Sequence, residues 1–308
     1  MQHVTVRVPA STSNLGPGFD CLGVALRIYN TITVIRGQSP EQAHPQIVSQ
    51  AAGKFFKRAR CTAFPFSLSI AEEIPRSRGL GSSATIRLGI LHGLNRLSGD
   101  PLDRLAIFQL CAELEGHPDN AAPAAFGGFS IVIQSMHNGI SAFQRFDVSP
   151  RLYFVLLIPE FEVRTSMARK LLPSKVSHTA AVENCANACA VAAAFVSKDY
   201  EKLRGAFRDH LHQPFRTKLV PFLPRVIAAA EKAGALGAFL SGSGSAICAV
   251  TLQQPKRVAA AIKLSAESSP RTLIARADNR GVRIIRLGDS EIAYALRRTT
   301  GNSNGPAA

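Results

Sequence analysis

Residues 78–84 (RGLGSSA) bring two glycines and two serines together at the start of an apolar segment, a combination typical of an anion-binding loop. Gly79 and Gly81 let the backbone curl so that its N–H groups point inward, and Ser82 and Ser83 add hydroxyl donors. A helix that begins here adds unpaired N–H groups and the positive end of its dipole. The segment therefore predicts a cradle for a phosphate chain, with a plain turn and a serine N-cap as the alternative.

A second polar segment, residues 9–20 (PASTSNLGPGFD), is rich in glycine and proline and lies between apolar stretches. Loops of this composition often carry ligand contacts. Asn14 can donate and accept hydrogen bonds, and the carboxylate of Asp20 could hold an ammonium or a hydroxyl group. We expect ligand contacts here, with Asx turns and capping as the alternative.

Residues 115–120 (EGHPDN) place a carboxylate, an imidazole, an aspartate and an amide beside an apolar helix. Burying such groups is costly unless they bind something, and Mg²⁺ with a phosphate would satisfy them. Magnesium needs few protein carboxylates, because water and nucleotide oxygens complete its shell. Glu115 with Ser82 or Ser83 is therefore a sufficient ligand set, and Glu113 is the alternative carboxylate.

Hydrophobic periodicity places elements around these segments. Residues 64–70 are predicted to form a strand that leads into the glycine loop, and residues 83–97 form a helix with one apolar stripe. A further helix is predicted over residues 102–115, with Asp100 as its N-cap and Pro101 at its first position. The order of strand, loop and helix puts the predicted cradle at a helix N-terminus.

The second half of the chain begins near residue 150 and predicts a β-α-β-β-α-β order with extra helices, as in ferredoxin-like domains. The fold class is α+β, with domains over residues 1–150 and 151–298 and a disordered tail over residues 299–308. The expected elements are strands at residues 152–158 and 282–287, a strand pair within 237–250, and helices at 178–196, 200–212, 222–233 and 255–266.

The 308-residue chain carries a formal net charge of +15, which favours contact with polyanions or with phosphorylated small molecules. The densest basic cluster, residues 54–60, lacks a recognisable nucleic-acid-binding module and is predicted to be a solvated face. The N-terminal residues do not resemble a signal peptide, and no apolar run is expected to cross a bilayer. We therefore expect a soluble, cytoplasmic protein.

Six scattered cysteines show no zinc-binding spacing and are predicted to be buried thiols in a reducing compartment. Cys185 and Cys189 lie four residues apart in an alanine-rich stretch. They are predicted to be small core residues on one helix face, in preference to metal ligands.

Three segments, residues 9–20, 78–84 and 241–246 (SGSGSA), resemble the GHMP small-molecule kinases in the same order along nearly the whole chain. Within that superfamily, residues 9–20 and 115–120 are similar to the homoserine kinases. The resemblance implies an N-terminal ATP-binding domain of the ribosomal-protein type and a C-terminal ferredoxin-like domain. It also implies ATP-dependent phosphorylation of the L-homoserine hydroxyl, giving O-phospho-L-homoserine and ADP in threonine biosynthesis, with Mg²⁺.

The resemblance also implies roles for individual residues. Asp20 would face the substrate ammonium, and the forked guanidinium groups of Arg169 and Arg216 would hold its carboxylate. The implied phosphate-binding residues are Arg78, Gly79, Leu80, Gly81, Ser82, Ser83 and Ala84. The implied metal ligands are Ser83 and Glu115, with Ser82 as the alternative serine. The implied substrate-binding residues are Asn14, Asp20, Asn120, Arg169 and Arg216, and the implied catalytic residues are Asp119, Asn120 and Arg169.

Several alternatives stay open at this level. Asp119 could accept the hydroxyl proton, although phosphoryl transfer can proceed by positioning and charge neutralisation without a strong base. His117 suits a structural role as well as a catalytic one, and Ser245 stands where relatives often have proline. Another acceptor of the mevalonate or shikimate type is the main alternative function, and a basic nucleic-acid-binding protein is a more remote one. No nucleic-acid or membrane partner is expected, and a homodimer is left open.

Overall fold

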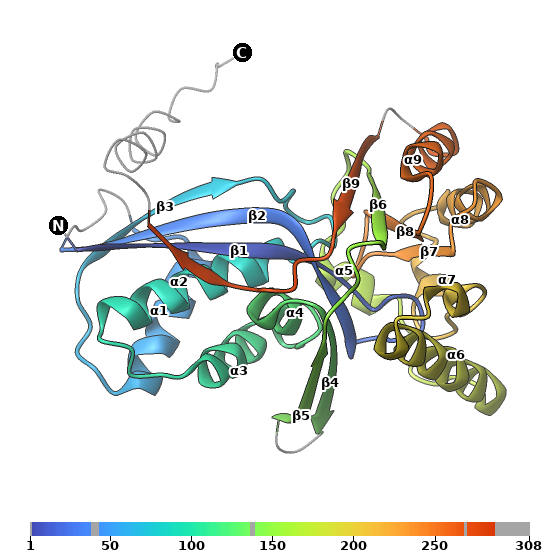
Figure 1. The fold of residues 1–308 in the computed structure, drawn as a ribbon. Coiled ribbons are helices and arrows are strands. Elements are labelled where there is room, and N and C mark those ends of the chain that lie inside the picture. Colours follow the sequence, from blue (N-terminus) through green and yellow to red (C-terminus); the bar gives the residue numbers. More distant parts are fainter. Residues whose placement is uncertain (1, 38–42, 136–138, 268–269, 287–308) are drawn as a thin grey trace, which may run out of the picture.

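The computed structural model describes residues 2–37, 43–135, 139–267 and 270–286, and it contains two antiparallel sheets that lie next to each other (Figure 1). The first sheet has six strands in the order β10-β1-β2-β4-β5, with β3 paired to β2. Its strands are β1 (His3–Ser13), β2 (Leu22–Arg36), β3 (Phe66–Glu72), β4 (Phe129–Ser135), β5 (Gly139–Phe146) and β10 (Arg283–Ile285).

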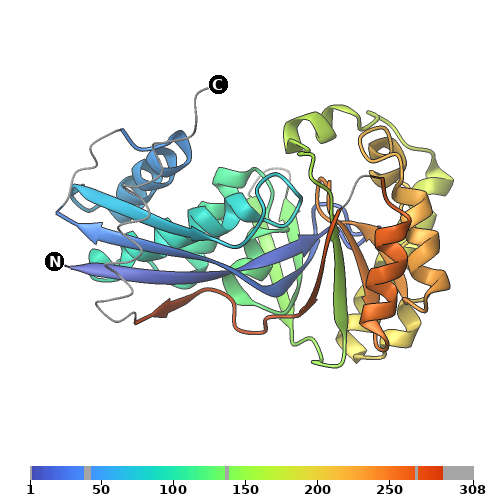
Figure 2. The same ribbon diagram turned by 90° about the horizontal axis from the view of Figure 1, so that it is seen from above.

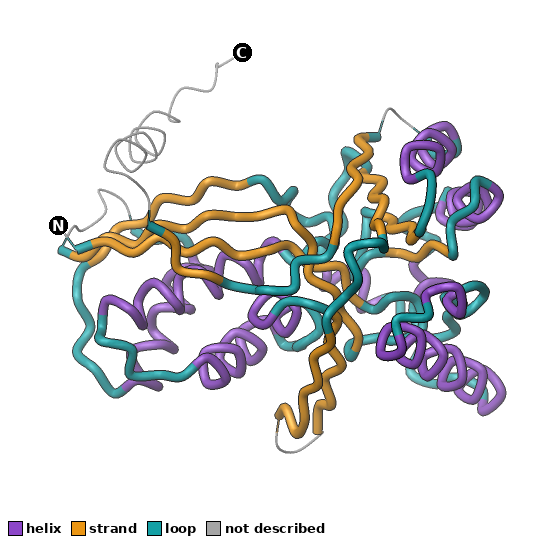
Figure 3. Tube along the Cα trace, in the orientation of Figure 1, coloured by secondary structure: helices purple, strands orange, loops and turns teal. Residues whose placement is uncertain are grey.

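The helices of the described part of the first domain all lie on one face of the first sheet (Figure 3). They are α1 (Gln46–Ala59), α2 (Ser82–Leu97), α3 (Arg104–Glu115) and α4 (Ala121–Phe126). The buried stripe of α2 includes Leu88, Leu91 and Leu94, which pack in one core with Val6 and Ile32 of the sheet. Burial of this stripe fixes α2 against the sheet, so that its N-terminus lies beside the end of β1.

The second sheet has the strand order β7-β8-β6-β9, which is the arrangement that a β-α-β-β-α-β chain gives in a ferredoxin-like domain. Two helices pack on its outer face, away from the first domain (Figure 2). The strands are β6 (Tyr153–Ile158), β7 (Gly237–Leu240), β8 (Ile247–Thr251) and β9 (Arg271–Arg276). The outer helices are α8 (Leu223–Lys232) and α9 (Pro255–Leu264), and the others are α5 (Thr165–Lys170), α6 (His178–Ser197), η1 (Tyr200–Leu203) and α7 (Gln213–Arg216).

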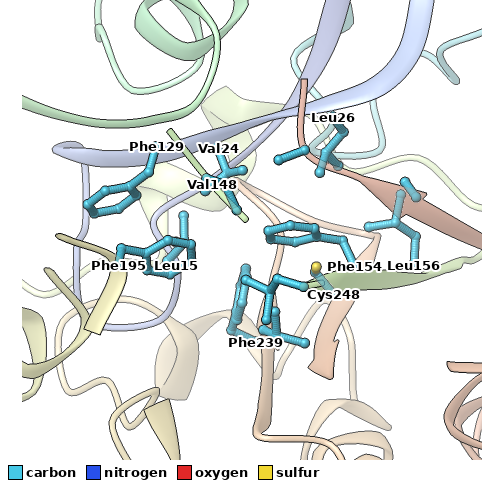
Figure 4. Packing of buried hydrophobic residues seen from close by; sticks show 14 of the residues in the cluster. Leu15, Val24, Leu26, Phe129, Val148, Phe154, Leu156, Phe195, Phe239 and Cys248 are labelled. Carbon is cyan, nitrogen blue, oxygen red and sulfur yellow. The ribbon is translucent and has the colours of Figure 1, made fainter. Parts of the chain in front are cut away.

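A shared core joins the two domains (Figure 4). Phe129 of the first sheet stacks on Phe195 of α6, with ring centroids 4.4 Å apart. Phe154 and Phe239 of the second sheet lie in the same buried cluster. Since large apolar groups from both sheets are buried together, the spacing between the domains is set by packing.

The last described strand departs from the expected division at residue 150. A strand was expected over residues 282–287 as the end of the second domain, but β10 pairs with β1 of the first sheet. A bridge between Leu26 and Ala277 carries the chain across on the way. Alternating residues alone do not say which sheet edge a strand will join. The expected tail, residues 299–308, lies outside the described residues.

Two helix predictions were wrong in detail. Asp103, and not Asp100, is the N-cap of α3, because its carboxylate accepts the N–H of Ala106 at 2.7 Å. Asp100 instead has a left-handed backbone, with φ 58°. The helix expected over residues 200–212 is only the short η1, since the carboxylate of Asp209 accepts backbone N–H groups of the following residues and favours a turn there.

Helix α6 also differs from expectation. Cys185 and Cys189 are exposed, so they are not core residues, and Cys21 and Cys61 are only partly buried. The helix packs on the domain through one face that includes Val191 and Phe195. By length and composition α6 could cross a membrane, contrary to the expectation from the sequence. One such helix does not indicate a membrane protein, because helices of soluble proteins pass the same test.

Candidate active site

A cavity of about 430 Å³ lies where the two domains meet. It brings together four segments that the sequence singled out: residues 9–20, 78–84, 115–120 and the turn after β7 that begins at residue 241. Arg169 of α5 and Arg216 of α7 also line it. Segments distant in the chain thus form one site.

The glycine loop is held from both sides by backbone contacts. Gly79 has φ +73°, and a Cβ on it would lie 1.9 Å from the carbonyl oxygen of Ser241. Gly81 has φ +69°, and a Cβ on it would lie 2.2 Å from Oγ of Ser11. The hydroxyl of Ser241 donates to the Gly79 carbonyl at 2.7 Å. Only glycine fits at these two positions, so the loop that opens α2 has a fixed shape.

The other predicted members of the cradle take different places. Ser82 and Ser83 are the first residues of α2, and Leu80 and Ala84 are buried. Arg78 directs its Nε to the carbonyl of Pro159 at 2.8 Å and a terminal nitrogen to the carbonyl of Glu160. Its hydrogen bonds therefore connect the cradle to the second domain.

One carboxylate and one hydroxyl meet at the edge of the cradle. Oγ of Ser83 donates to Oε2 of Glu115 at 2.7 Å, and Arg87 forms an ion pair with Oε1. The hydroxyl of Ser82 is buried without a hydrogen-bond partner among the described residues. Glu113, by contrast, is about half exposed and pairs with Lys54 at 3.3 Å.

The donor set at this point fits magnesium. Mg²⁺ is commonly held by one or two carboxylates, with water and phosphate oxygens completing the shell. Glu115 and Ser83 lie at the cavity and already share a hydrogen bond, whereas Glu113 is not among the residues that line it. The described residues contain no group of three or more acidic, histidine or cysteine side chains that could hold a metal by itself.

His117 and Asp119 form a buried pair, with Nδ1 2.8 Å from Oδ1. Burial alone would lower the pKa of His117, but the hydrogen bond and charge of Asp119 outweigh it and raise that pKa. Burial would raise the pKa of Asp119, but the contact with His117 and the hydrogen bond from Ser13 lower it. The aspartate is therefore held ionised and is a weak base.

Two predicted substrate-binding amides are anchored to the surrounding backbone and hydroxyl groups. Asn120 accepts a hydrogen bond from Oγ of Ser11 at 2.8 Å and donates to Oγ of Ser13 at 3.0 Å. Asn14 donates to the carbonyl of Gly242 at 3.0 Å and has a left-handed backbone with φ 70°. Both line the cavity, and both connect β1 to other parts of the site.

The structure brings Asp20 and Arg169 together, although the resemblance assigned them to different groups of a substrate, its ammonium and its carboxylate. The guanidinium of Arg169 donates two hydrogen bonds to the carboxylate of Asp20, at 2.9 and 2.7 Å. Each side chain remains about one third exposed. The pair satisfies both charges and leaves them accessible from the cavity.

Unlike Arg169, which is partly exposed and forms an ion pair, Arg216 is buried and donates its hydrogen bonds to neutral groups. It is 2% exposed and donates to the carbonyl of Gly242 at 2.9 Å and to Nδ1 of His212 at 3.2 Å. Its Nε has no partner among the described residues. Burial, with the nearby charge of Arg169, lowers the pKa of Arg216 to about 10. An anion beside this guanidinium would be strongly favoured.

Sequence reasoning missed residues that complete this end of the cavity. The ring of Phe19 lies 5.2 Å from the guanidinium of Arg216 and 5.5 Å from that of Arg169, and it stacks on His212. Thr165 lines the cavity near the hydroxyl of Ser243. Phe19 could have been predicted because it precedes Asp20 in the sequence. The sequence around Thr165 and His212 contains no pattern that would have singled them out.

The chain matches the model of the GHMP kinases N terminal domain over residues 46–128 and that of GHMP kinases C terminal over residues 191–267. A homoserine kinase from Caldicellulosiruptor bescii is 39% identical over 264 residues, covering 80% of this chain and 84% of the relative. The chain belongs to the homoserine kinase family of the GHMP kinases. A second member of this family, from Caldicellulosiruptor saccharolyticus, is 36% identical over 93% of this chain and 98% of the relative.

Solved structures agree with the family. The homoserine kinase from Cytophaga hutchinsonii superimposes with a TM-score of 0.82 at 25% identity, covering 92% of this chain and 98% of that one. A mevalonate kinase from Methanococcus jannaschii has a TM-score of 0.65 at 14% identity, covering 90% and 99%, and shares the fold alone. The predicted two-domain GHMP kinase fold and the class of ATP-dependent small-molecule kinase are confirmed.

Proposed function

We propose that this protein transfers the γ-phosphoryl group of ATP to the side-chain hydroxyl of L-homoserine, giving O-phospho-L-homoserine and ADP. The observation that carries the proposal is the charge arrangement in the cavity. Asp20, Arg169 and Arg216 line the same cavity as the glycine loop. The cavity thus offers charged groups that suit a zwitterionic amino acid and a loop that suits phosphate.

The charged groups are matched to both charges of an amino acid. An α-amino acid can replace the Asp20–Arg169 pair with two new pairs, its ammonium on Asp20 and its carboxylate on Arg169. The unpartnered Nε of Arg216 supports a further hydrogen bond to that carboxylate. Mevalonate carries a carboxylate but no ammonium, so it would leave Asp20 without a cationic partner.

Phosphate binding relies on residues 79–84. Their backbone N–H groups and the N-terminus of α2 would bind the phosphates of ATP, and Ser83 and Glu115 would hold Mg²⁺. When bound, Mg²⁺ neutralises charge on the phosphates. Arg87 contacts Glu115 through the oxygen that Ser83 does not use, so it orients the carboxylate toward the cradle.

The transfer forms a bond between the homoserine hydroxyl oxygen and the γ-phosphorus, and it breaks the bond between that phosphorus and the bridging oxygen of ADP. ADP keeps the electron pair, and the hydroxyl proton passes to solvent or to the phosphoryl oxygens. Asp119 is held ionised by His117, which supports an electrostatic and positioning role for it in preference to a strong base. Asn120 and Arg169 would fix the hydroxyl-bearing substrate against the phosphate.

In this proposal residues 1–150 form the ATP-binding domain, and the second domain supplies Arg169 and Arg216. The reaction belongs to threonine biosynthesis. The cytoplasm suits a biosynthetic reaction that consumes ATP.

A screen of acceptors tests the proposal. ADP release is measured with ATP, Mg²⁺ and each of L-homoserine, mevalonate, shikimate and galactose, and ³¹P NMR identifies the product. We expect kcat/KM for L-homoserine to exceed that for the other acceptors by at least about 100-fold, since mevalonate and shikimate lack the ammonium that Asp20 would bind and galactose lacks both charged groups. Preference for any other acceptor would overturn the proposal.

A further inference from the structure

His212 is a fully buried imidazole at the contact between the two domains, and the reaction proposed above does not use it. It is 0% exposed and immediately precedes α7. Its Nε2 lies 2.8 Å from the carbonyl oxygen of Gly16 in the first domain. Its Nδ1 lies 3.2 Å from a terminal nitrogen of Arg216 in the second domain.

The two partners determine which nitrogen carries the proton. A guanidinium can only donate, so Nδ1 of His212 must accept from Arg216. A carbonyl can only accept, so Nε2 must donate to Gly16. The imidazole is therefore neutral and protonated at Nε2. Burial lowers the pKa of His212 to about 4, which agrees with the neutral form.

The nearest acidic group does not require a charged imidazole. Oδ2 of Asp209 is 3.5 Å from Nε2, but it already accepts backbone N–H groups from His212 at 3.0 Å and from Gln213 at 2.6 Å. Asp209 thus fixes the turn before α7, and the proton at Nε2 remains with Gly16. Arg216 and Asp20 are the other charged groups that affect this imidazole.

A neutral partner has a consequence for Arg216. Both acceptors of its guanidinium, Nδ1 of His212 and the Gly242 carbonyl, carry no net charge. They fix the orientation of the group without adding to the negative charge that Asp20, Asp209 and Asp119 already place nearby, so the guanidinium can still attract an incoming carboxylate. An aspartate or glutamate in place of His212 would instead place a further negative charge beside it.

The other end of His212 fixes the loop that carries Asp20. Asn14, Leu15 and Asp20 all have positive φ, of 70°, 46° and 59°, so the loop is held in a sparsely populated conformation. The hydrogen bond to Gly16 and the stacked ring of Phe19 both place His212 against this loop. One side chain therefore holds the loop and Arg216 at a fixed separation.

We propose that His212 is a positioning residue for amino-acid recognition: as a neutral imidazole it connects the Gly16 carbonyl to Arg216 and orients, for the substrate carboxylate, a guanidinium whose direct acceptors are both neutral. The inference rests on the proposed function, because it takes an amino acid as the ligand. If His212 only filled space, its replacement would loosen the whole site and change the KM values for homoserine and ATP alike.

The test compares His212→Phe, which keeps a ring beside Phe19 but has no polar atoms, with His212→Gln, which keeps one donor and one acceptor. Steady-state kinetics with L-homoserine and ATP are combined with thermal unfolding. We expect His212→Phe to raise the KM for homoserine by about 10- to 100-fold, the range for a hydrogen bond to a charged group. The KM for ATP should change less than about twofold, and His212→Gln should recover most of the loss.

A double-mutant cycle with Arg216→Met, which keeps an unbranched apolar side chain without charge, separates positioning from packing. In that background His212→Phe should reduce kcat/KM for homoserine clearly less than it does in the wild type, since one of the two groups that His212 positions is gone. Fully additive losses, or equal losses in the KM values of ATP and homoserine, would overturn the inference. Failure of the wild-type protein to phosphorylate homoserine would instead reject the proposed function, so the two failures are distinguishable.

Discussion

The proposed phosphate cradle and the proposed amino-acid pocket line one cavity but are built in different ways. The cradle is a single stretch, residues 79–84, that offers backbone N–H groups and hydroxyls. The pocket is made of charged side chains from the loop after β1 and from α5 and α7. A loop that binds through its backbone takes its shape from glycines, which have no side chain. A pocket made of side chains from both domains depends on how the two domains pack together.

The difference predicts different responses to mutation. The glycines of the cradle have neighbouring atoms so close that a Cβ would clash with them. Replacing one of these glycines should therefore distort the loop and lower activity with either substrate varied. In the pocket, separate charged side chains would each bind one group of the amino acid. Removing one charge should therefore weaken the binding of homoserine and leave the binding of ATP unchanged. The four experiments below test this contrast.

The largest effect is expected for Gly79→Ala. The new Cβ would lie 1.9 Å from the Ser241 carbonyl, and the backbone has φ +73°. Distortion of the loop should lower kcat/KM on the order of 1000-fold with either substrate varied, comparable to loss of a preorganised donor. Gly53→Ala is the control, since that glycine lies within α1 with open space around it and should slightly stabilise the protein. A mild effect at Gly79 would show that the cradle is adaptable.

Arg216→Ala should act on one substrate only. Loss of the buried guanidinium removes a charge-assisted contact to the carboxylate and should raise the KM for homoserine about 100-fold. The KM for ATP should stay within about twofold, as judged by initial rates at varied ATP. Arg208→Ala, at an exposed arginine nearby, is the matched control. Parallel loss of ATP affinity would remove the contrast between the two regions.

The Asp20–Arg169 pair predicts discrimination by charge. 4-Hydroxybutanoate lacks the ammonium of homoserine, and 3-aminopropan-1-ol lacks its carboxylate, so each should have a kcat/KM at least about 30-fold lower. Asp20→Asn frees Arg169, so this variant should lose activity with homoserine but gain several-fold with 4-hydroxybutanoate relative to the wild type. Equal losses with both acceptors would contradict the pairing argument.

The smallest effect concerns the two serines at the start of α2. Ser83→Ala removes the hydroxyl beside Glu115 and should raise the Mg²⁺ concentration for half-maximal rate by about tenfold. Ser82→Ala, at a buried hydroxyl without a hydrogen-bond partner, should shift it less than about threefold. Binding of Mn²⁺ with ADP, followed by electron paramagnetic resonance, gives the same comparison without turnover. The reverse ranking would assign the ligand to Ser82.

The local structure of the glycine segment was predictable from the sequence because its determinants are local. Two glycines, two serines and an apolar helix stripe lie within one short segment, and α2 begins at Ser82 as expected within one residue. The ferredoxin-like strand order was also predictable, because it follows from the order of strands and helices along the chain.

The residues of the pocket were predicted, but the contacts between their side chains were not. The resemblance named Asp20, Arg169 and Arg216, but the pairing of Asp20 with Arg169 and the buried contact of Arg216 with His212 arise only when the domains pack. The prediction that Cys185 is buried was wrong for a similar reason, since its residue type is apolar but its side chain is exposed among the described residues. Sequence periodicity defines the faces of an element, and tertiary packing decides which of them is buried.

The pairing of β10 with β1 has a mechanical consequence. The chain leaves the second domain and adds a strand to the first sheet, through pairs such as Thr5 with Ile285. A hinge that pulled the domains apart would have to break these strand hydrogen bonds as well as the shared aromatic core. Separation of the two domains would therefore cost these contacts, which resist a change in the width of the cavity.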